Sequence, residues 1–236
     1  MSRAAFALVL AGAFVMPVFA IGSGDREKPP TTAQVLEAAQ PSDWRRPDPA
    51  NTLYLDLDAG RVIIELAPRF APEHVANIKR LVAERFFDGL AVVRVQDNFV
   101  AQWGDPDNTR PSETAKRKLP DETVIAWNRA LPFVKLPDTD GYARETGWID
   151  GFPVGIERKS GQVWMTHCYG TLGVGREDWP DNGSSSELYV VIGQAPRQLD
   201  RNIVVAGRAL RGMEHLSAPP RGSGALGFYE EAQPRV

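Results

Sequence analysis

Short β-rich segments recur along this chain of 236 residues, and only one long segment has the spacing of a helix. Leu53, Leu55 and Leu57 alternate with other residues, and Gly60 then turns the chain back. Alternation with a period of two is typical of a half-buried strand, so residues 52–66 are predicted to form a β-hairpin. Further strands are predicted at residues 90–95, 162–167, 187–192 and 202–209.

The long helical pattern covers residues 68–86. Pro72 stands where a proline is tolerated in the first turn, and Glu73 favours a helix start. The apolar face of this helix is predicted to carry Val75, Ile78, Leu81 and Val82, and to close one end of a sheet. A second, shorter helix is predicted over residues 212–217.

Many short strands with one long and one short helix favour a mainly β domain, built as a closed or nearly closed barrel, over an alternating α/β sheet. The domain is predicted to span residues 52–236. Residues 106–161 are irregular and rich in proline and charge, and they interrupt it as an insertion. This insertion is interpreted either as a surface element that shapes the edge of a cleft or as solvated connecting loops.

The N-terminus has the pattern of an export signal that is removed. Arg3 precedes an apolar run from Ala4 to Val18, and small residues at Val18 and Ala20 suit a cleavage site. The run is short for a membrane span, which needs about 20 residues. Residues 1–20 are therefore predicted to be a signal peptide, with a retained anchor as the alternative.

Residues 21–51 are polar and rich in proline, and they are predicted to form a flexible arm. With the signal peptide removed, the protein is predicted to be periplasmic or secreted, without membrane association. The net charge of −3 gives no electrostatic reason to expect a nucleic-acid partner. The one cysteine, Cys168, makes an intrachain disulfide impossible.

No metal and no cofactor is predicted. His167 and Cys168 are adjacent, so on a strand they would face opposite sides, which argues against a nucleophile and base pair. His74 and His215 are isolated in the sequence and have no ligand spacing.

Residues 93–104 form a predicted strand, turn and strand that carry Arg94, Phe99 and Gln102. A guanidinium is always charged and presents a rigid fork of donors, so beside exposed apolar side chains it suits a site that grips an amide. This arrangement indicates chemistry on peptide bonds. A surface arginine that covers a neighbouring strand, or one in a structural salt bridge, is the alternative.

Three segments of the chain carry a recognisable pattern. They read Phe87-Asp88-Gly89-Leu90 with Val93-Arg94-Val95, Asn98-Phe99, Gln102 and Gly104-Asp105; then Ser185-Ser186-Glu187-Leu188-Tyr189; then Leu199-Asp200-Arg201-Asn202-Ile203-Val204-Val205-Ala206-Gly207-Arg208. These segments resemble the sequence signature of the cyclophilins, which are peptidyl-prolyl cis-trans isomerases. The order and rough spacing agree with that family, and the resemblance covers about residues 52–216, apart from the insertion.

The resemblance implies a closed eight-stranded antiparallel barrel, capped by a helix at each end, with a substrate groove on its outer face. Arg94 would be the catalytic arginine, and Gln102 a polar residue that supports it. The substrate-binding residues would be Phe99, Val100 and Tyr189 in an apolar proline pocket, Leu199 near its rim, Glu187, and Met165, Thr166 and His167, which would offer backbone groups to a peptide. Residues 169–184 would form a loop beside the groove.

Several residues depart from the family pattern, and Glu187, which stands in place of a glutamine, matters most. A carboxylate near Arg94 could orient the guanidinium, or pair with it and withdraw it from substrate. The other departures are Val93 and Ile203 in place of histidines, and Arg197 or Gln198 in place of an aromatic residue. The last of these predicts weak binding of the cyclic peptide drug that defines the family.

The predicted function is therefore that of a monomeric peptidyl-prolyl cis-trans isomerase acting on proline-containing polypeptides during the folding of exported proteins. The alternative is a binding or chaperone-like module that uses the same groove with weak turnover. A final strand that closes the barrel is not evident. Pairing by residues 226–229 is one explanation, and a natural protein that extends further is another.

Overall fold

The computed structural model describes residues 28–107, 109–176 and 181–230, so the predicted signal peptide lies outside the described residues. The chain divides into two units between Arg45 and Arg46. In the first unit, helix α1 (Thr32–Ala38) begins after Thr31, whose hydroxyl accepts a hydrogen bond from the backbone amide of Gln34. The α1 helix buries none of its residues, and a short 3-10 helix, η1 (Pro41–Asp43), follows it.

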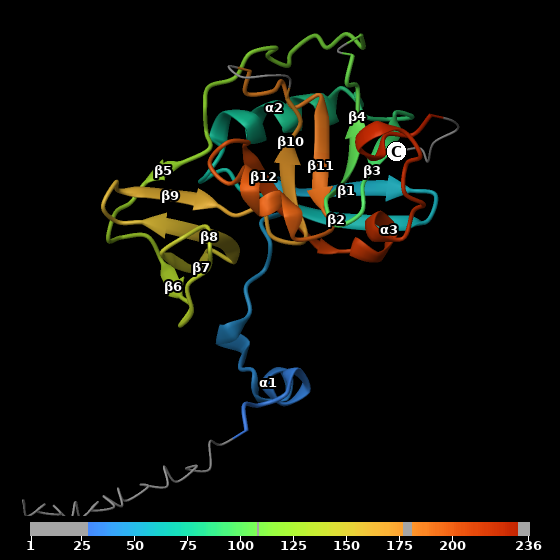
Figure 1. Ribbon diagram of the computed structural model, residues 1–236. Helices are drawn as coiled ribbons and strands as arrows, with labels where there is room; N and C mark the ends of the chain where they lie inside the picture. Colours follow the sequence, from blue (N-terminus) through green and yellow to red (C-terminus); the bar gives the residue numbers. More distant parts are fainter. Residues whose placement is uncertain (1–27, 108, 177–180, 231–236) are drawn as a thin grey trace, which may run out of the picture. The chain divides into compact units, whose positions relative to one another are not determined.

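The second unit opens with a 3-10 turn, η2 (Pro49–Asn51), and contains a curled seven-stranded antiparallel sheet (Figure 1). Its strands, in order across the sheet, are β1 (Thr52–Leu57), β2 (Gly60–Leu66), β12 (Val205–Arg211), β10 (Thr171–Val174), β11 (Glu187–Val191), β4 (Val100–Gly104) and β3 (Ala91–Val95). The predicted hairpin and the strands predicted near β3, β11 and β12 are confirmed. The β12 strand begins later than predicted because the amides of Asn202 and Ile203 donate to the carbonyl of Leu199.

One face of this sheet encloses the main apolar core. Leu188 and Val190 of β11 belong to that core, whereas Tyr189 and Val191 belong to a separate cluster on the opposite face. Successive side chains of a strand point to opposite faces, so β11 contributes to both.

Two helices lie at opposite ends of the curled sheet (Figure 1). The α2 helix (Pro72–Ala83) buries Val75, Ile78 and Leu81, and α3 (Met213–Ser217) buries Leu216. Val82 is 42% exposed, so its predicted place on the buried face of α2 is wrong. None of the helices in the described part of the chain has the length and apolar composition needed to cross a membrane.

Residues 125–165 form a second antiparallel sheet with a core of its own. Its strands, in order, are β5 (Ile125–Ala126), β9 (Gln162–Met165), β8 (Phe152–Glu157), β7 (Glu145–Ile149) and β6 (Phe133–Lys135). Ile149, Val154, Ile156 and Val163 are almost fully buried there. The strand predicted at residues 162–167 is confirmed, but the interpretation of residues 106–161 as solvated loops is wrong, because pairing of β7 with β8 buries apolar residues between prolines and charges.

The predicted mainly β fold is confirmed, but its sheet has seven strands and does not close into the expected barrel of eight. The edge strands of the first sheet are β1 and β3, and no described strand pairs with the outer edge of β1. The C-terminal segment reaches β3 through a single β-bridge between Arg94 and Phe228. The predicted pairing of residues 226–229 is thus confirmed only as a bridge, because Leu226 and Gly227 have positive φ angles that interrupt an extended strand.

The expectation that residues 169–184 form only a loop is also wrong, because β10 is a central strand of the first sheet. Gly173 lies in β10 opposite Tyr189, and a Cβ atom there would lie 2.1 Å from the Cζ atom of the tyrosine ring. Glycine weakens a strand pattern in the sequence, yet here it is required by the close approach of an aromatic ring.

Candidate active site

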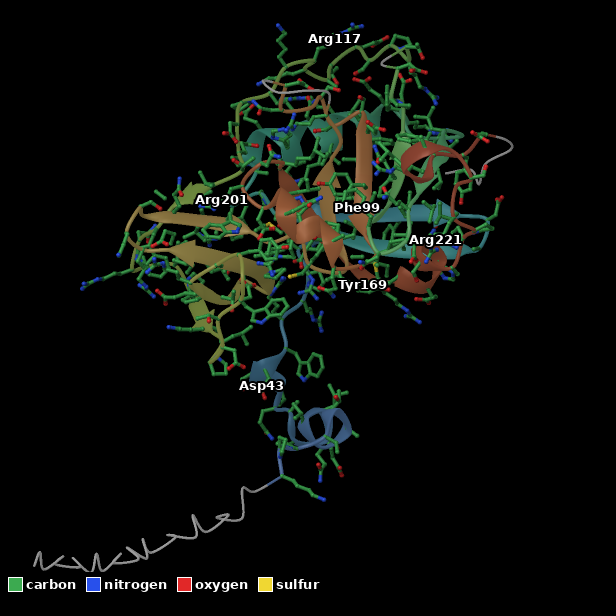
Figure 2. The ribbon with its side chains drawn as sticks, viewed as in Figure 1. Asp43, Phe99, Arg117, Tyr169, Arg201 and Arg221 are labelled. Carbon is green, nitrogen blue, oxygen red and sulfur yellow. The ribbon has the colours of Figure 1, made fainter. Side chains whose placement is uncertain are left out.

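An apolar cluster lies on the outer face of the first sheet. Val100, Tyr189 and Val191 are almost fully buried in it, and the half-buried side chains of Phe99 and Ile203 pack against them. Phe99 lies in the turn between β3 and β4, and Figure 2 labels it over the strands of the first sheet. Phe99 and Ile203 therefore present the accessible part of an apolar surface, of which Val100 and Tyr189 form the floor.

A β-bulge places Arg94 beside this surface. The register of β3 against β4 shifts between Val92 and Arg94, so that Val92 and Val95 are both buried in the core while Arg94 is half-buried on the other face. Strict alternation would put Val92 and Arg94 on the same face. The extra residue, Val93, turns the arginine outward, which is a recognised effect of a bulge.

The guanidinium of Arg94 is held by several groups. Its Nη1 donates to Oε1 of Gln102 at 3.4 Å, and its Nη2 donates to Oε1 of Gln96. The guanidinium carbon lies 5.0 Å from the centroid of the Phe99 ring, which is within range of a cation–π contact. Partial burial lowers the pKa of Arg94 below its usual range, although the charge of Glu187 opposes this shift.

Gln102 links Arg94 to Glu187. Its Nε2 donates to Oε1 of Glu187 at 2.6 Å. No ion pair joins Arg94 and Glu187 directly among the described residues, so the glutamate orients the arginine through the amide instead of neutralising it. Burial raises the pKa of Glu187 above its usual range, and the hydrogen bond from Gln102 and the charge of Arg94 only partly offset this effect.

A second chain of polar side chains lies beneath the cluster. The hydroxyl of Tyr189 lies 2.9 Å from Nε2 of His167, and Nδ1 of His167 lies 3.2 Å from Oδ1 of Asp200. A carboxylate only accepts, so Nδ1 carries the proton, and in the neutral imidazole Nε2 accepts from the tyrosine. Burial raises the pKa of Tyr189 far above its usual range, so its hydroxyl stays protonated and donates.

Asp200 anchors this second chain. Burial tends to raise its pKa, but hydrogen bonds from the side chain and backbone amide of His167 and the charge of Arg197 hold the pKa below its usual range. Its Oδ2 also accepts from Nε1 of Trp164 at 3.2 Å and from Nε of Arg197 at 3.0 Å. All four of these contacts keep the carboxylate ionised and fixed.

Comparison with known proteins identifies the family. The family model "Cyclophilin type peptidyl-prolyl cis-trans isomerase/CLD" matches residues 52–223. The chain belongs to the cyclophilin family. A probable peptidyl-prolyl cis-trans isomerase of Brucella suis is 29% identical over 178 residues, which cover 75% of this chain and 76% of the relative.

Solved structures agree with this family. A cyclophilin from Hirschia baltica matches with a TM-score of 0.69 and 26% identity, covering 88% of this cyclophilin and 79% of that chain. A cyclophilin type isomerase from Cryptosporidium parvum, crystallised in the presence of the dipeptide Ala-Pro, matches with a TM-score of 0.51 and 15% identity over 78% of this chain and 94% of that one. At that identity the second match supports the fold alone. The resemblance drawn from the sequence is confirmed, and the chain is a cyclophilin-type peptidyl-prolyl cis-trans isomerase.

The structure brings most of the predicted site residues of this cyclophilin together. Arg94, Phe99, Val100, Gln102, Glu187 and Tyr189 lie on the outer face of three neighbouring strands or in the turn between two of them. Leu199 ends a short 3-10 helix, η3 (Ala195–Leu199), and its carbonyl accepts from the amide of Ile203 at 3.1 Å, so it adjoins the cluster through the backbone.

The amides of Thr166 and His167 are not available to a peptide. The amide of Thr166 donates to the carbonyl of Pro153 at 3.0 Å, and that of His167 donates to Oδ1 of Asp200 at 2.8 Å. The imidazole of His167 is fully buried, because it serves the second polar chain. These two amides are therefore occupied within the protein, and the expectation that Met165, Thr166 and His167 offer other backbone groups to a peptide stays a prediction.

Three contributors to the site were missed from the sequence: Gln96, Leu226 and Phe228. Gln96 directly follows the strand, and its side chain reaches back to Arg94. Leu226 and Phe228 belong to another part of the chain, and only the apolar pattern of residues 226–229 gave a signal that this segment pairs with the sheet.

The remaining candidate groups have structural roles. His74 is fully buried, and its Nδ1 lies 2.7 Å from Oε2 of Glu122. Cys168 is a free cysteine whose sulfur lies 3.1 Å from the hydroxyl of Thr166. Within the described residues no group of three or more histidine, cysteine, aspartate or glutamate side chains is arranged to hold a metal ion.

Proposed function

We propose that Arg94 is the catalytic residue of this isomerase, and that its substrates are proline-containing segments of exported polypeptides. The observation that carries the proposal is the position of the Arg94 guanidinium 5.0 Å from the Phe99 ring, at the edge of the apolar cluster. In this arrangement the apolar surface can hold the proline ring while the cation donates hydrogen bonds to the X–Pro amide.

The chemistry explains why these residue types are sufficient. Rotation about an X–Pro bond faces a barrier of about 18–20 kcal/mol and takes tens to hundreds of seconds unaided, because it breaks amide resonance. In the twisted amide the nitrogen is no longer conjugated and becomes a better hydrogen-bond acceptor. A guanidinium beside that nitrogen and the prolyl carbonyl therefore stabilises the twisted state more than either planar state. No nucleophile takes part.

The surrounding residues have separate tasks in this proposal. The half-exposed Phe99 and Ile203 contact the pyrrolidine ring and hold it while the preceding residue rotates. Gln102 is a positioning residue, because it accepts from Arg94 and is itself held by Glu187. The proline-directed chemistry is supported by the match of residues 52–223 to the family model of cyclophilin type peptidyl-prolyl cis-trans isomerases.

Exchange spectroscopy on a proline-containing test peptide tests the catalytic role. We expect wild-type protein to accelerate exchange between the cis and trans peptide, and Arg94→Ala to lower kcat/KM about 100-fold, as expected when a preorganised donor to a transition state is lost. Arg61→Ala is the matched control, because Arg61 also lies over an aromatic ring, that of Tyr54 at 4.7 Å, but belongs to the β1–β2 hairpin, at the opposite end of the strand order from β3.

The same experiment separates the two functions considered. If the peptide resonances show binding to the wild type but the exchange rate stays at its uncatalysed value, the protein is a peptide-binding module and the catalytic proposal fails. If Arg94→Ala and Arg61→Ala change the rate equally, Arg94 is not the catalytic residue.

The exported location is a separate proposal, supported by the charge and apolar pattern of residues 1–20. Residues 1–51 fused to a phosphatase that is active only outside the bacterial cytoplasm provide the test. We expect phosphatase activity and removal of the first 20 residues, and loss of both when Leu8 and Leu10 are replaced by aspartate. Activity without cleavage would indicate the retained anchor, and no activity would contradict export.

A further inference from the structure

A C-terminal loop, residues 221–230, runs along the free edge of β3. The amide of Gly222 donates to the carbonyl of Val95 at 2.9 Å, and the amide of Tyr229 donates to the carbonyl of Val93 at 3.0 Å. Between these two contacts the loop bridges to Arg94 itself through Phe228. Most of the loop lies beyond residues 52–223, which the family model matches.

The C-terminal loop contacts the side chain of Arg94 at two points. The carbonyl oxygen of Leu226 accepts from Nε of Arg94 at 2.7 Å. The ring centroid of Phe228 lies 5.2 Å from the guanidinium carbon, almost the same distance as the Phe99 ring on the strand side of the site. Two aromatic rings and a carbonyl from distant parts of the sequence therefore act on one guanidinium.

The backbone of the C-terminal loop is strained where it makes this contact. Leu226 has a φ of 56° and Gly227 a φ of 78°, and the Leu226 side chain is 66% exposed, so its packing does not explain the conformation. The left-handed conformation instead directs the carbonyl of Leu226 toward Nε of Arg94. Backbone strain of this kind in a residue other than glycine tends to cluster at functional sites.

The loop leaves donors for a substrate. A guanidinium has five N–H groups. One binds Leu226, one Gln102 and one Gln96, so three are used and two remain, one on each terminal nitrogen. The contacts therefore fix the plane of the guanidinium without consuming it.

We propose that the C-terminal loop positions Arg94 for catalysis, and that Phe228 is the side chain through which it does so. This inference rests on the proposed role of Arg94. A long arginine side chain has many rotamers, and holding one of them before substrate arrives removes the cost of ordering it in the transition state. The loop thus adds to the site a positioning element that lies outside the three signature segments.

Kinetics on loop variants test the inference. We expect Phe228→Ala to lower kcat/KM about tenfold, mainly through kcat, with KM within about twofold of wild type, because the orientation of Arg94 is lost while the apolar surface remains. Phe228→Tyr keeps the ring and is expected to restore activity to within about twofold of wild type. Tyr54→Ala is the matched control, because it removes the ring from the Arg61 pair and is expected to leave kcat/KM unchanged.

A second substitution displaces the loop without touching the ring. A Cβ atom on Gly227 would lie 2.7 Å from Cβ of Gln96, and its positive φ disfavours any other residue. Gly227→Ala is expected to lower kcat/KM as much as Phe228→Ala. In an Arg94→Ala background neither change is expected to lower the residual activity further, because both act through Arg94.

Several outcomes would overturn the inference. A rise in kcat/KM for Phe228→Ala would mean that the loop restrains the site. An equal loss in the Arg94→Ala background, or a fall in the thermal midpoint together with a rise in KM, would mean a general structural role. Wild-type protein without any isomerase activity would refute the proposed function. The side-chain Nε–H resonance of Arg94 would then test, independently of activity, whether the loop positions Arg94. We expect that resonance to be sharp and slow to exchange in wild type and to broaden in Phe228→Ala; no change would refute the positioning.

Discussion

Two chains of hydrogen-bonded side chains flank the same apolar cluster and differ in exposure. The rim chain consists of Arg94, Gln102 and Glu187, and the buried chain of Tyr189, His167 and Asp200. In each chain a carboxylate is bonded to a middle side chain, which in turn bonds an end group at the apolar cluster, Arg94 in one chain and Tyr189 in the other. In the rim chain the end group is half-buried and keeps two donors, whereas in the buried chain the tyrosine is 4% exposed and its hydroxyl is occupied.

Because of this difference in exposure, we expect the two chains to have different roles. A buried polar group that loses its partner costs the full desolvation energy, so the buried chain contributes to stability. A half-exposed cation with free donors can instead exchange water for a substrate amide. The two chains are therefore expected to respond oppositely to substitution, one in unfolding free energy and the other in turnover.

The largest effect is expected from His167→Ala, which breaks the buried chain at its centre. Tyr189 and Asp200 would both lose a partner in a buried place, so the free energy of unfolding should fall by about 3 kcal/mol. Urea unfolding followed by far-UV circular dichroism measures this. His215→Ala, at a histidine whose side chain is 26% exposed, is the control, and an equal loss there would remove the distinction.

The complementary test on the rim chain is Gln102→Leu, which keeps the volume but removes both hydrogen bonds. We expect kcat/KM to fall about tenfold, or about 1.4 kcal/mol in transition-state stabilisation, because Arg94 loses one restraint. The accompanying loss of unfolding free energy should be clearly smaller than that of His167→Ala. If Gln102→Leu loses unfolding free energy but keeps the kcat/KM of wild type, the rim chain has a structural role like that of the buried chain.

Tyr189→Phe sharpens the comparison at a residue that both the cluster and the buried chain use. The ring remains in the cluster and only the hydroxyl is lost, so kcat/KM should stay within about twofold while the free energy of unfolding falls by about 1 kcal/mol. Chemical denaturation and the exchange assay on the same preparation give both quantities. A large loss of turnover would place the hydroxyl in the catalytic site.

The two carboxylates should also respond oppositely to pH. The folded pKa of Asp200 lies below 3.8, so its stabilising contribution is complete above about pH 4 and is lost as the pH falls toward the folded value. Thermal midpoints measured between pH 2 and pH 5 should show a steeper fall for wild type than for Asp200→Asn. Parallel curves would mean that Asp200 does not titrate differently in the folded protein.

The smallest effect is expected from Glu187→Gln. The folded pKa of Glu187 lies above 4.5, so the folded protein binds more protons than the unfolded chain, and stability falls as the pH rises from 4.5 through the folded value. Removing the charge should raise the free energy of unfolding at pH 7 by about 1 kcal/mol or less. Calorimetry at pH 4 and pH 7 measures the difference between the two proteins, which should be larger at pH 7.

Local pattern was enough to predict several elements. The alternation of Leu53, Leu55 and Leu57 predicted the hairpin, and the spacing of Val75, Ile78 and Leu81 predicted α2, because in both cases burial follows the period of the element itself. The signature around Arg94 and Phe99 predicted the family and the nearness of these two side chains.

Other features depend on contacts that no local pattern contains. Gly173 weakens the signal of β10, and only the position of the Tyr189 ring explains why a glycine is needed there. His167 was assigned to the substrate groove because of its place in the motif, but Asp200, 33 residues further along, draws its amide and ring inward. Arg94 and Phe228 are separated by more than half of the chain, and neither segment by itself predicts their contact.

Trp164 gives the buried chain a built-in optical reporter. Its indole is almost fully buried, donates to Asp200 and lies 4.7 Å from the guanidinium carbon of Arg201. Fluorescence of an indole is sensitive to charge nearby, so protonation of a single carboxylate inside the protein should alter its emission without any added dye. The integrity of the scaffold beneath the site could then be followed on the same preparation that is used for the exchange assay.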